Sequence, residues 1–140
     1  MRILIALDAT AASRKVVDYL LKYPAVFKGP QLEVLYVDPP PALRAVGAFG
    51  ADPGMAALPP GDPQAVIGPV IEPLKAAGYS VDVEVREGEP GPEITQIATD
   101  GAYDLIVMGA GERGLLRRKL LGSVAHTVLS HSTTPMLIVR

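Results

Sequence analysis

Residues 104–114 have the sequence Asp-Leu-Ile-Val-Met-Gly-Ala-Gly-Glu-Arg-Gly, an apolar run followed by a cluster of glycines. The run is short and rich in branched aliphatic side chains, which predicts a buried β-strand over 104–108. The glycines that follow predict a loop that begins where this strand ends. In α/β proteins ligands bind beyond the carboxyl ends of parallel strands, so this stretch indicates both a fold class and the place of a site.

Four further segments have strand-like sequences. One of them, at 79–85, alternates apolar and polar residues as a half-exposed strand does. The other three are apolar and lie at 3–7, 32–37 and 135–140. Helical spacing of apolar residues separates the strands. We therefore predict one three-layer α/β domain over 1–140, with helices on both faces of a doubly wound, parallel, five-stranded sheet.

Several of the predicted helices carry start and stop signals. Thr10 is a suitable N-cap for the first helix, which Pro24 would end. Asp62 and the proline after it predict the start of the next helix. Pro69 and Pro73 lie inside that helix and predict a kink or a later start, because proline lacks the N–H group that a helix interior uses.

Between residues 39 and 60 the sequence is rich in proline, glycine and alanine and has no periodicity. This composition predicts a flexible loop within the domain. Further along, Pro92 is predicted to open a helix that Gly101 ends, and Gly122-Ser123 is predicted to open the last helix.

Composition limits the classes of function. The net charge of −2 gives no basic surface, so we expect no nucleic-acid partner. The chain has no cysteine, which excludes disulfides and thiolate metal sites. Because the apolar run at 3–7 is too short for a signal-peptide core and no run approaches a membrane span, we expect a cytoplasmic protein without membrane contacts. His126 and His131 are five residues apart, a spacing that does not suit a shared metal ion, so we expect no metal ligands.

The glycines at 109–114 formally match the dinucleotide pattern Gly-x-Gly-x-x-Gly. That motif belongs directly after the first strand of a domain, whereas this one follows the fourth, which argues against NAD. A better interpretation combines the loop with Gly122-Ser123, because the start of a helix offers unpaired N–H groups and a positive dipole to a phosphate. Ser123 could instead cap its own helix.

Five segments resemble, in order and spacing, those of the universal stress protein family. They are Ile-Leu-Ile-Ala-Leu-Asp at 3–8, Arg-Glu-Gly-Glu-Pro at 86–90, Ile-Val-Met-Gly-Ala at 106–110, Leu-Leu-Gly-Ser-Val at 120–124 and Pro-Met-Leu-Ile-Val at 135–139. The resemblance implies the strand order 3-2-1-4-5. It also implies that ATP, or AMP or ADP, binds between the ends of strands one and four, with or without Mg²⁺.

The resemblance further implies which residues bind the nucleotide. Ala6 and Asp8 would lie near the ribose, and the main chain of Val37 would contact the adenine. The whole set is Ala6, Asp8, Val37, Met108, Gly109, Ala110, Gly111, Glu112, Arg113, Gly114, Gly122, Ser123, Val124 and Ala125. For Asp8 a competing interpretation remains, in which its carboxylate caps the first helix.

Glu112 departs from the family pattern, which has a glycine at that position between Gly109 and Gly122-Ser123. At about 5 Å from a phosphate and an effective dielectric near 20, its carboxylate would cost about 3 kcal/mol. Two features offset this cost. Gly111 and Gly114 form a second Gly-x-x-Gly through which the loop could close, and the nearby basic residues Arg113, Arg117, Arg118 and Lys119 supply positive charge.

The expected function is a stress-response or signalling module that binds an adenine nucleotide as a homodimer. The dimer would form through the C-terminal strand, because an apolar edge strand is a liability that pairing with a second copy removes. Two alternatives stay open: a dimer that binds no nucleotide and acts through protein contacts, and a slow ATPase. The sequence near the glycine loop offers no positioned base, so we expect no catalytic residue.

Overall fold

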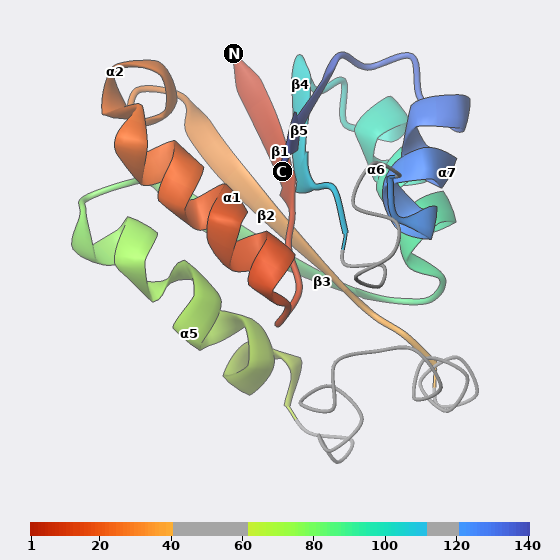
Figure 1. Ribbon diagram of the computed structural model, residues 1–140, viewed down its shortest axis with the longest axis horizontal. Helices are drawn as coiled ribbons and strands as arrows, with labels where there is room; N and C mark the ends of the chain where they lie inside the picture. Colours follow the sequence, from red (N-terminus) through yellow and green to blue (C-terminus); the bar gives the residue numbers. More distant parts are fainter. Residues whose placement is uncertain (41–61, 112–120) are drawn as a thin grey trace.

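The computed structural model describes residues 1–40, 62–111 and 121–140. Its centre is one five-stranded sheet with the order β3-β2-β1-β4-β5, and all neighbouring strands are parallel (Figure 1). This arrangement confirms the predicted fold class and strand order. The loop predicted at 39–60 lies outside the described residues, apart from its first two.

The central strand of the sheet is the first strand of the chain. The strands are β1 (Arg2–Ala6), β2 (Gln31–Asp38), β3 (Val81–Glu87), β4 (Leu105–Gly109) and β5 (Met136–Val139). Within β1, Ile5 pairs with Val34 of β2 and Val107 of β4. Because neighbours flank β1 on both sides and helices cover both faces, Ile3 and Ile5 have no exposed surface. The edge strand β3 is half-exposed, as its alternating sequence predicts.

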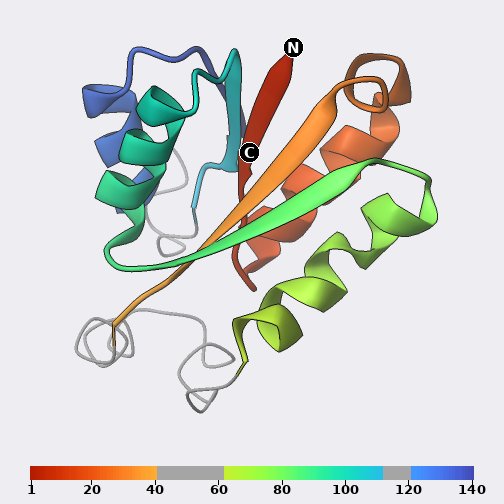
Figure 2. The ribbon, with the colours of Figure 1, turned by 180° about the vertical axis from the view of Figure 1, so that it is seen from behind.

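The helices are α1 (Ala11–Lys22), α2 (Pro24–Phe27), α5 (Pro63–Ala76), α6 (Pro90–Asp100) and α7 (Ser123–His131). One face of the sheet is covered by α1 and α5 and the other by α6 and α7, while the short helix α2 follows α1 (Figures 1 and 2). Side chains alternate along β1, so Ile3 and Ile5 join the core with α1 and α5, and Leu4 joins the core with α6 and α7. No helix in the described part of the chain is long and apolar enough to cross a membrane.

Most helix ends follow their sequence signals. Thr10 caps α1, and its Oγ1 accepts a bond from the Ser13 N–H group at 3.4 Å. Asp62 caps α5 in the same way through the Gln64 N–H group at 3.0 Å. The first helix ends directly before Pro24 as predicted, and Pro24 then occupies the first position of the short helix α2. One detail differs from prediction: α6 begins at Pro90 rather than Pro92, because a proline suits the first helical turn.

Helix α5 does not start late, although Pro69 and Pro73 lie inside it. A proline in a helix interior costs about 3 kcal/mol. Burial of the apolar face of α5 stabilises the helix. The buried residues of this face are Ile67, Val70, Ile71 and Leu74. Each such side chain contributes about 1.5–3 kcal/mol when it is buried, so packing against the sheet offsets the lost hydrogen bonds.

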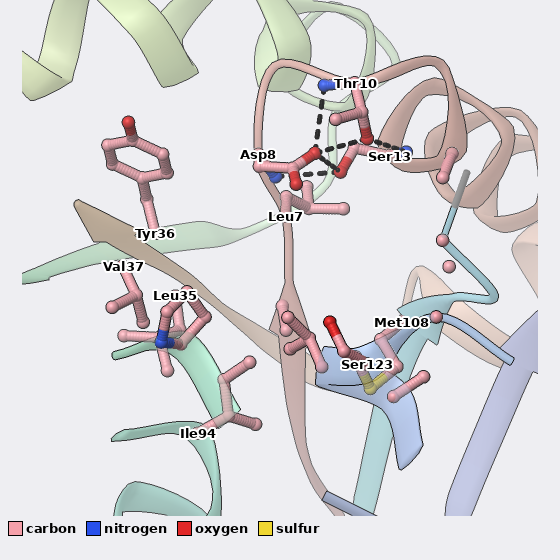
Figure 3. Close-up of a pocket in the computed structure, with 18 of the residues that line it drawn as sticks. Leu7, Asp8, Thr10, Ser13, Leu35, Tyr36, Val37, Ile94, Met108 and Ser123 are labelled. Carbon is pink, nitrogen blue, oxygen red and sulfur yellow. Dashed lines mark hydrogen bonds between the residues drawn. The ribbon is translucent and has the colours of Figure 1, made fainter. Parts of the chain in front are cut away.

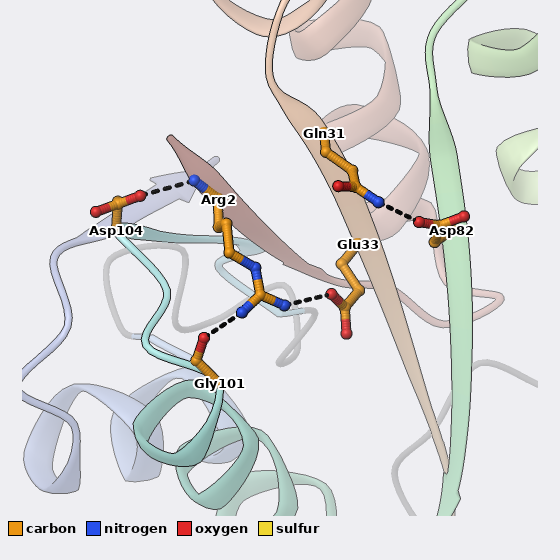
Figure 4. A network of polar contacts seen from close by, with 6 residues as sticks. All are labelled: Arg2, Gln31, Glu33, Asp82, Gly101 and Asp104. Atoms are coloured by element: carbon orange, nitrogen blue, oxygen red, sulfur yellow. Dashed lines mark hydrogen bonds and ion pairs between the residues drawn. The ribbon is translucent and has the colours of Figure 1, made fainter.

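At the amino end of the sheet, Arg2 joins three segments of the chain (Figure 4). Its backbone N–H group donates to Asp104 Oδ2 at 2.7 Å, and its guanidinium group donates to Gly101 O at 2.5 Å and Glu33 Oε2 at 3.1 Å. The guanidinium carbon also lies 4.5 Å from the centre of the Tyr103 ring. We call Arg2, Glu33, Gly101, Tyr103 and Asp104 the Arg2 network.

Candidate functional site

A pocket opens at the carboxyl ends of β1 and β4, where the strand order reverses (Figure 3). Its volume is about 300 Å³, at the lower end of the range for small-molecule sites. The lining residues are Ala6, Leu7, Asp8, Thr10, Ala12, Ser13, Leu35, Tyr36, Val37, Pro39, Pro90, Ile94, Met108, Gly109, Gly111, Gly122, Ser123, Val124 and Ala125. They come from the ends of β1, β2 and β4 and from the first turns of α1, α6 and α7.

Asp8 supplies the one carboxylate among these lining residues. Its Oδ1 accepts hydrogen bonds from the Thr10 N–H group at 2.9 Å, the Thr10 hydroxyl at 2.5 Å and the Ser13 hydroxyl at 2.7 Å. These bonds hold Thr10 and Ser13 at the start of α1, but the N-cap of the helix is Thr10, so the interpretation of Asp8 as the helix cap is wrong. Within the described ranges, no hydrogen bond uses Oδ2.

Opposite this polar corner the pocket wall is apolar. Leu35 and Val37 of β2 and Ile94 of α6 lie together on one side, and Met108 of β4 lies on the other (Figure 3). All four side chains are buried. Such a wall suits a flat aromatic group, because burial of its faces removes apolar surface from water.

Ser123 lies at the start of α7, but it does not cap the helix. Gly122 occupies the N-cap position, Ser123 is the first helical residue, and no side chain in the described part of the chain caps this end. The capping interpretation of Ser123 is therefore wrong. Its hydroxyl and the first N–H groups of α7 are placed at the pocket wall, where a helix start attracts a negative group.

Gly109 and Gly111 have physical reasons to be glycine that do not involve a ligand. A side chain on Gly109 would come within 2.9 Å of Ala12 Cβ, so the end of β4 can approach α1 only without one. Gly111 has a φ of +82°, and a Cβ there would lie 3.0 Å from Gly122 Cα. The Gly122 N–H group donates to Ala110 O at 2.6 Å and closes this contact.

The pocket brings together ten of the fourteen residues predicted to bind nucleotide. They are Ala6, Asp8, Val37, Met108, Gly109, Gly111, Gly122, Ser123, Val124 and Ala125. Ala110 does not line it, and Glu112, Arg113 and Gly114 lie outside the described residues. Sequence reasoning missed the other nine lining residues, which are Leu7, Thr10, Ala12, Ser13, Leu35, Tyr36, Pro39, Pro90 and Ile94. The signal for Ser13 was its place one turn into a helix directly after Asp8, whereas Ile94 looked like an ordinary core residue.

Comparison with known proteins decides the family. The model of the universal stress protein family matches residues 1–140. The chain belongs to the universal stress protein family. Universal stress protein Slr1230 of Synechocystis is 27% identical over 99% of this chain, and universal stress protein MJ0531 of Methanocaldococcus jannaschii is 41% identical over 45% of it. These matches cover only 42% and 37% of the two relatives' own lengths.

Solved structures of other proteins share the fold of this universal stress protein chain. The structure of MJ0577 from M. jannaschii has a TM-score of 0.75 at 24% identity and covers 99% of this chain and 94% of its own. Two others are complexes: one from Archaeoglobus fulgidus with dAMP (TM-score 0.67, 15% identity, 100% and 98% covered) and one from Arabidopsis thaliana with AMP (0.65, 15%, 99% and 90%). At these identities the likeness establishes the fold.

Proposed function

We propose that this universal stress protein binds an adenine nucleotide (AMP, ADP or ATP) in the pocket between β1 and β4, as a stress-response or signalling module. The observation that carries the proposal is the division of the pocket into an apolar wall, a fixed carboxylate and a helix start. An adenine nucleotide has three parts with matching chemistry: an aromatic base, a sugar with hydroxyl groups and a phosphate. The complexes of related folds with AMP and dAMP support the same choice.

Each part of the nucleotide has residues that suit it. The apolar wall of Leu35, Val37 and Ile94 would take the base. The Asp8 carboxylate accepts hydrogen bonds only, so it suits the sugar hydroxyls and would repel a phosphate. The N–H groups at the start of α7 and the Ser123 hydroxyl donate, so they suit the phosphates.

A Mg²⁺ ion would enter this site together with the phosphates. Among the described residues there is no group of three or more His, Cys, Asp or Glu side chains that could hold a metal ion. Asp8 alone does not form such a site. We therefore propose that any Mg²⁺ is held mainly by the nucleotide, and that binding of AMP does not require it.

We also propose that the protein is a cytoplasmic homodimer that pairs through β5. This strand lies at the edge of the sheet, is only four residues long and consists of Met136, Leu137, Ile138 and Val139. Leu137 packs against the core, whereas Ile138 is half-exposed and belongs to neither core cluster. Ile138→Lys should therefore give a monomer in analytical ultracentrifugation without unfolding the protein; an unchanged dimer would contradict the assignment to β5.

The test of nucleotide binding starts with freshly purified protein. After denaturation, chromatography of the supernatant should identify AMP, ADP or ATP, and calorimetry on protein stripped of nucleotide should measure the affinity of each. Binding of GMP, which carries the same sugar and phosphate, is the control for the base. Absence of bound nucleotide together with no heat of binding for any of the three would refute the proposal and favour a dimer that acts through protein contacts alone.

A further inference from the structure

Ser13 is the one buried polar residue in the described part of the chain, with 4% of its surface exposed. It lies in the first turn of α1 and touches Asp8 twice. Its hydroxyl accepts a hydrogen bond from the Asp8 N–H group at 2.8 Å and donates one to Asp8 Oδ1 at 2.7 Å (Figure 3). A buried hydroxyl that both donates and accepts a hydrogen bond has one orientation only, so it fixes the position of its partner Asp8.

Together with Thr10, Ser13 fixes the orientation of the Asp8 carboxylate. Oδ1 accepts three hydrogen bonds, two from Thr10 and one from Ser13, and is saturated. The bonds come from two different residues, so the carboxylate cannot rotate without breaking one of them. This leaves Oδ2 as the only oxygen of Asp8 able to accept a bond from a ligand in the pocket.

A fixed carboxylate with one oxygen that accepts no hydrogen bond from the described residues discriminates between ligands. It accepts a hydrogen bond from a ligand hydroxyl group at one position, and a ligand that lacks this group loses that bond. We propose that Ser13 is a positioning residue, which makes the pocket prefer ribose to deoxyribose by holding Asp8 in place. This inference rests on the proposed binding of adenine nucleotides and adds to it the basis of sugar selectivity.

The experiment measures a ratio of affinities. Calorimetry with AMP, 2′-deoxy-AMP and 3′-deoxy-AMP on the parent protein should show a preference for AMP of about tenfold or more over at least one deoxynucleotide, as expected for a hydrogen bond to a charged group. In Ser13→Ala the preference should fall to about twofold or less. The loss should come from weaker binding of AMP, while the affinity for that deoxynucleotide changes much less.

Two further variants separate positioning from a general loss of structure. Thr99→Ala is the control, because it also removes a hydroxyl that belongs to a helical residue and donates a hydrogen bond (to Thr95 O at 2.9 Å) but lies outside the pocket; its ratio should equal that of the parent. Asp8→Asn should lower the ratio as Ser13→Ala does. If Ser13 acts through Asp8, the double variant should have the ratio of Asp8→Asn alone.

Ser13→Cys keeps the size of the side chain and has a weak donor, so it replaces Ser13→Ala if the latter does not fold, and it should also lower the ratio. If the parent binds AMP and the Ser13→Ala or Ser13→Cys variant keeps the parent's preference, the role of Ser13 is refuted but the proposed function is not. The same holds if the parent binds AMP and both deoxynucleotides equally well. A parent that binds none of the three overturns the proposed function, and the role of Ser13 with it.

Discussion

The two ends of the sheet use similar residues in opposite ways. At the amino end, the Arg2 network pairs its charged groups with one another, and the neighbouring Gln31 side chain contacts Asp82 (Figure 4). At the carboxyl end, Asp8 uses one oxygen to hold α1, while Ser123 leaves the capping position to Gly122. At the amino end the polar groups bond to one another, whereas at the carboxyl end the Ser123 hydroxyl and Asp8 Oδ2 make no such bond within the described residues.

The energies of the polar contacts also differ between the two ends of the sheet. The side chains of Arg2 and Glu33 are 52% and 22% exposed, so water screens their attraction and the pair stabilises the fold by less than about 1 kcal/mol. The ion pair at the amino end therefore contributes little to stability. Polar groups at the carboxyl end stand beside buried apolar side chains, where each new hydrogen bond is worth more. We conclude that a site is recognised by incomplete hydrogen bonding near an apolar wall rather than by its number of charges.

We expect the largest loss of stability from a substitution of Gly111, at the carboxyl end of the sheet. Gly111→Ala puts a side chain on a residue with φ of +82° and brings it 3.0 Å from Gly122 Cα. We expect a loss of about 2 kcal/mol in the free energy of unfolding, roughly 6 °C in Tm, and weaker AMP binding. Gly29→Ala is the control, because among the described residues no atom beyond its two chain neighbours lies within 4 Å of the added methyl group. Equal melting temperatures for the two variants would show that the Gly111–Gly122 contact is not needed.

Ser123→Ala should weaken binding without destabilising the fold. The hydroxyl makes no capping bond, so its loss should leave Tm unchanged, while the affinity for AMP and ATP should fall about tenfold in calorimetry. Ser130→Ala, at the other end of α7, is the matched control and should bind like the parent. A lower Tm with unchanged affinity would reverse the assignment and make Ser123 a structural residue.

Alkaline pH should lower the free energy of unfolding through Tyr103, at the amino end of the sheet. Burial, and after it the nearby Glu33 carboxylate, raise the pKa of the Tyr103 hydroxyl above its ordinary value near 10. Above pH 10 the unfolded chain loses this proton while the folded chain keeps it, so stability falls as pH rises, by up to about 1.4 kcal/mol at pH 11. Tyr103→Phe should flatten this part of a urea-denaturation profile against pH. An equally steep decline in the variant would exclude Tyr103 as a cause.

We expect the mildest change for a substitution of Arg2, at the amino end of the sheet. Arg2→Met removes the contacts with Glu33 and Gly101 O but keeps the bond from its backbone to Asp104. The free energy of unfolding should fall by about 0.5–1 kcal/mol at low salt and by less in 1 M salt. Affinity for AMP should not change. If AMP binding fell in proportion to stability, the two ends of the sheet would not be independent.

The sequence was sufficient for the fold because periodicity and strand composition are local properties. The apolar run around Ile5 and the alternation around Val83 both gave strands of the predicted kind. Helix α5 shows where local rules fail, since its prolines are tolerated by packing that no single segment reveals. Sequence spacing likewise could not separate the roles of the glycines. Gly109 is explained by the approach of Ala12, a residue distant in the chain.

The site was predicted less completely for a related reason. Asp8 and Ser123 stand next to strand and helix ends, so their placement at the pocket follows from the order of elements. Ser13 and Ile94 enter the pocket through the direction of their side chains, which depends on how α1 and α6 pack on the sheet. Glu112, the departure from the family pattern, lies outside the described residues. Its effect on the phosphates stays a prediction.

The position of β1 in the middle of the sheet also determines when the pocket can form. Ile3 pairs on one side with Leu32 and on the other with Leu105, which follows roughly a hundred residues later and makes the contact order high. During synthesis β1 can join β2 early, but its other edge stays open until β4 has left the ribosome. The pocket lies between these two strands. Strand β1 is therefore enclosed only after β4 has been made, and a nucleotide that bound between the two strands would stabilise the chain only from that point on.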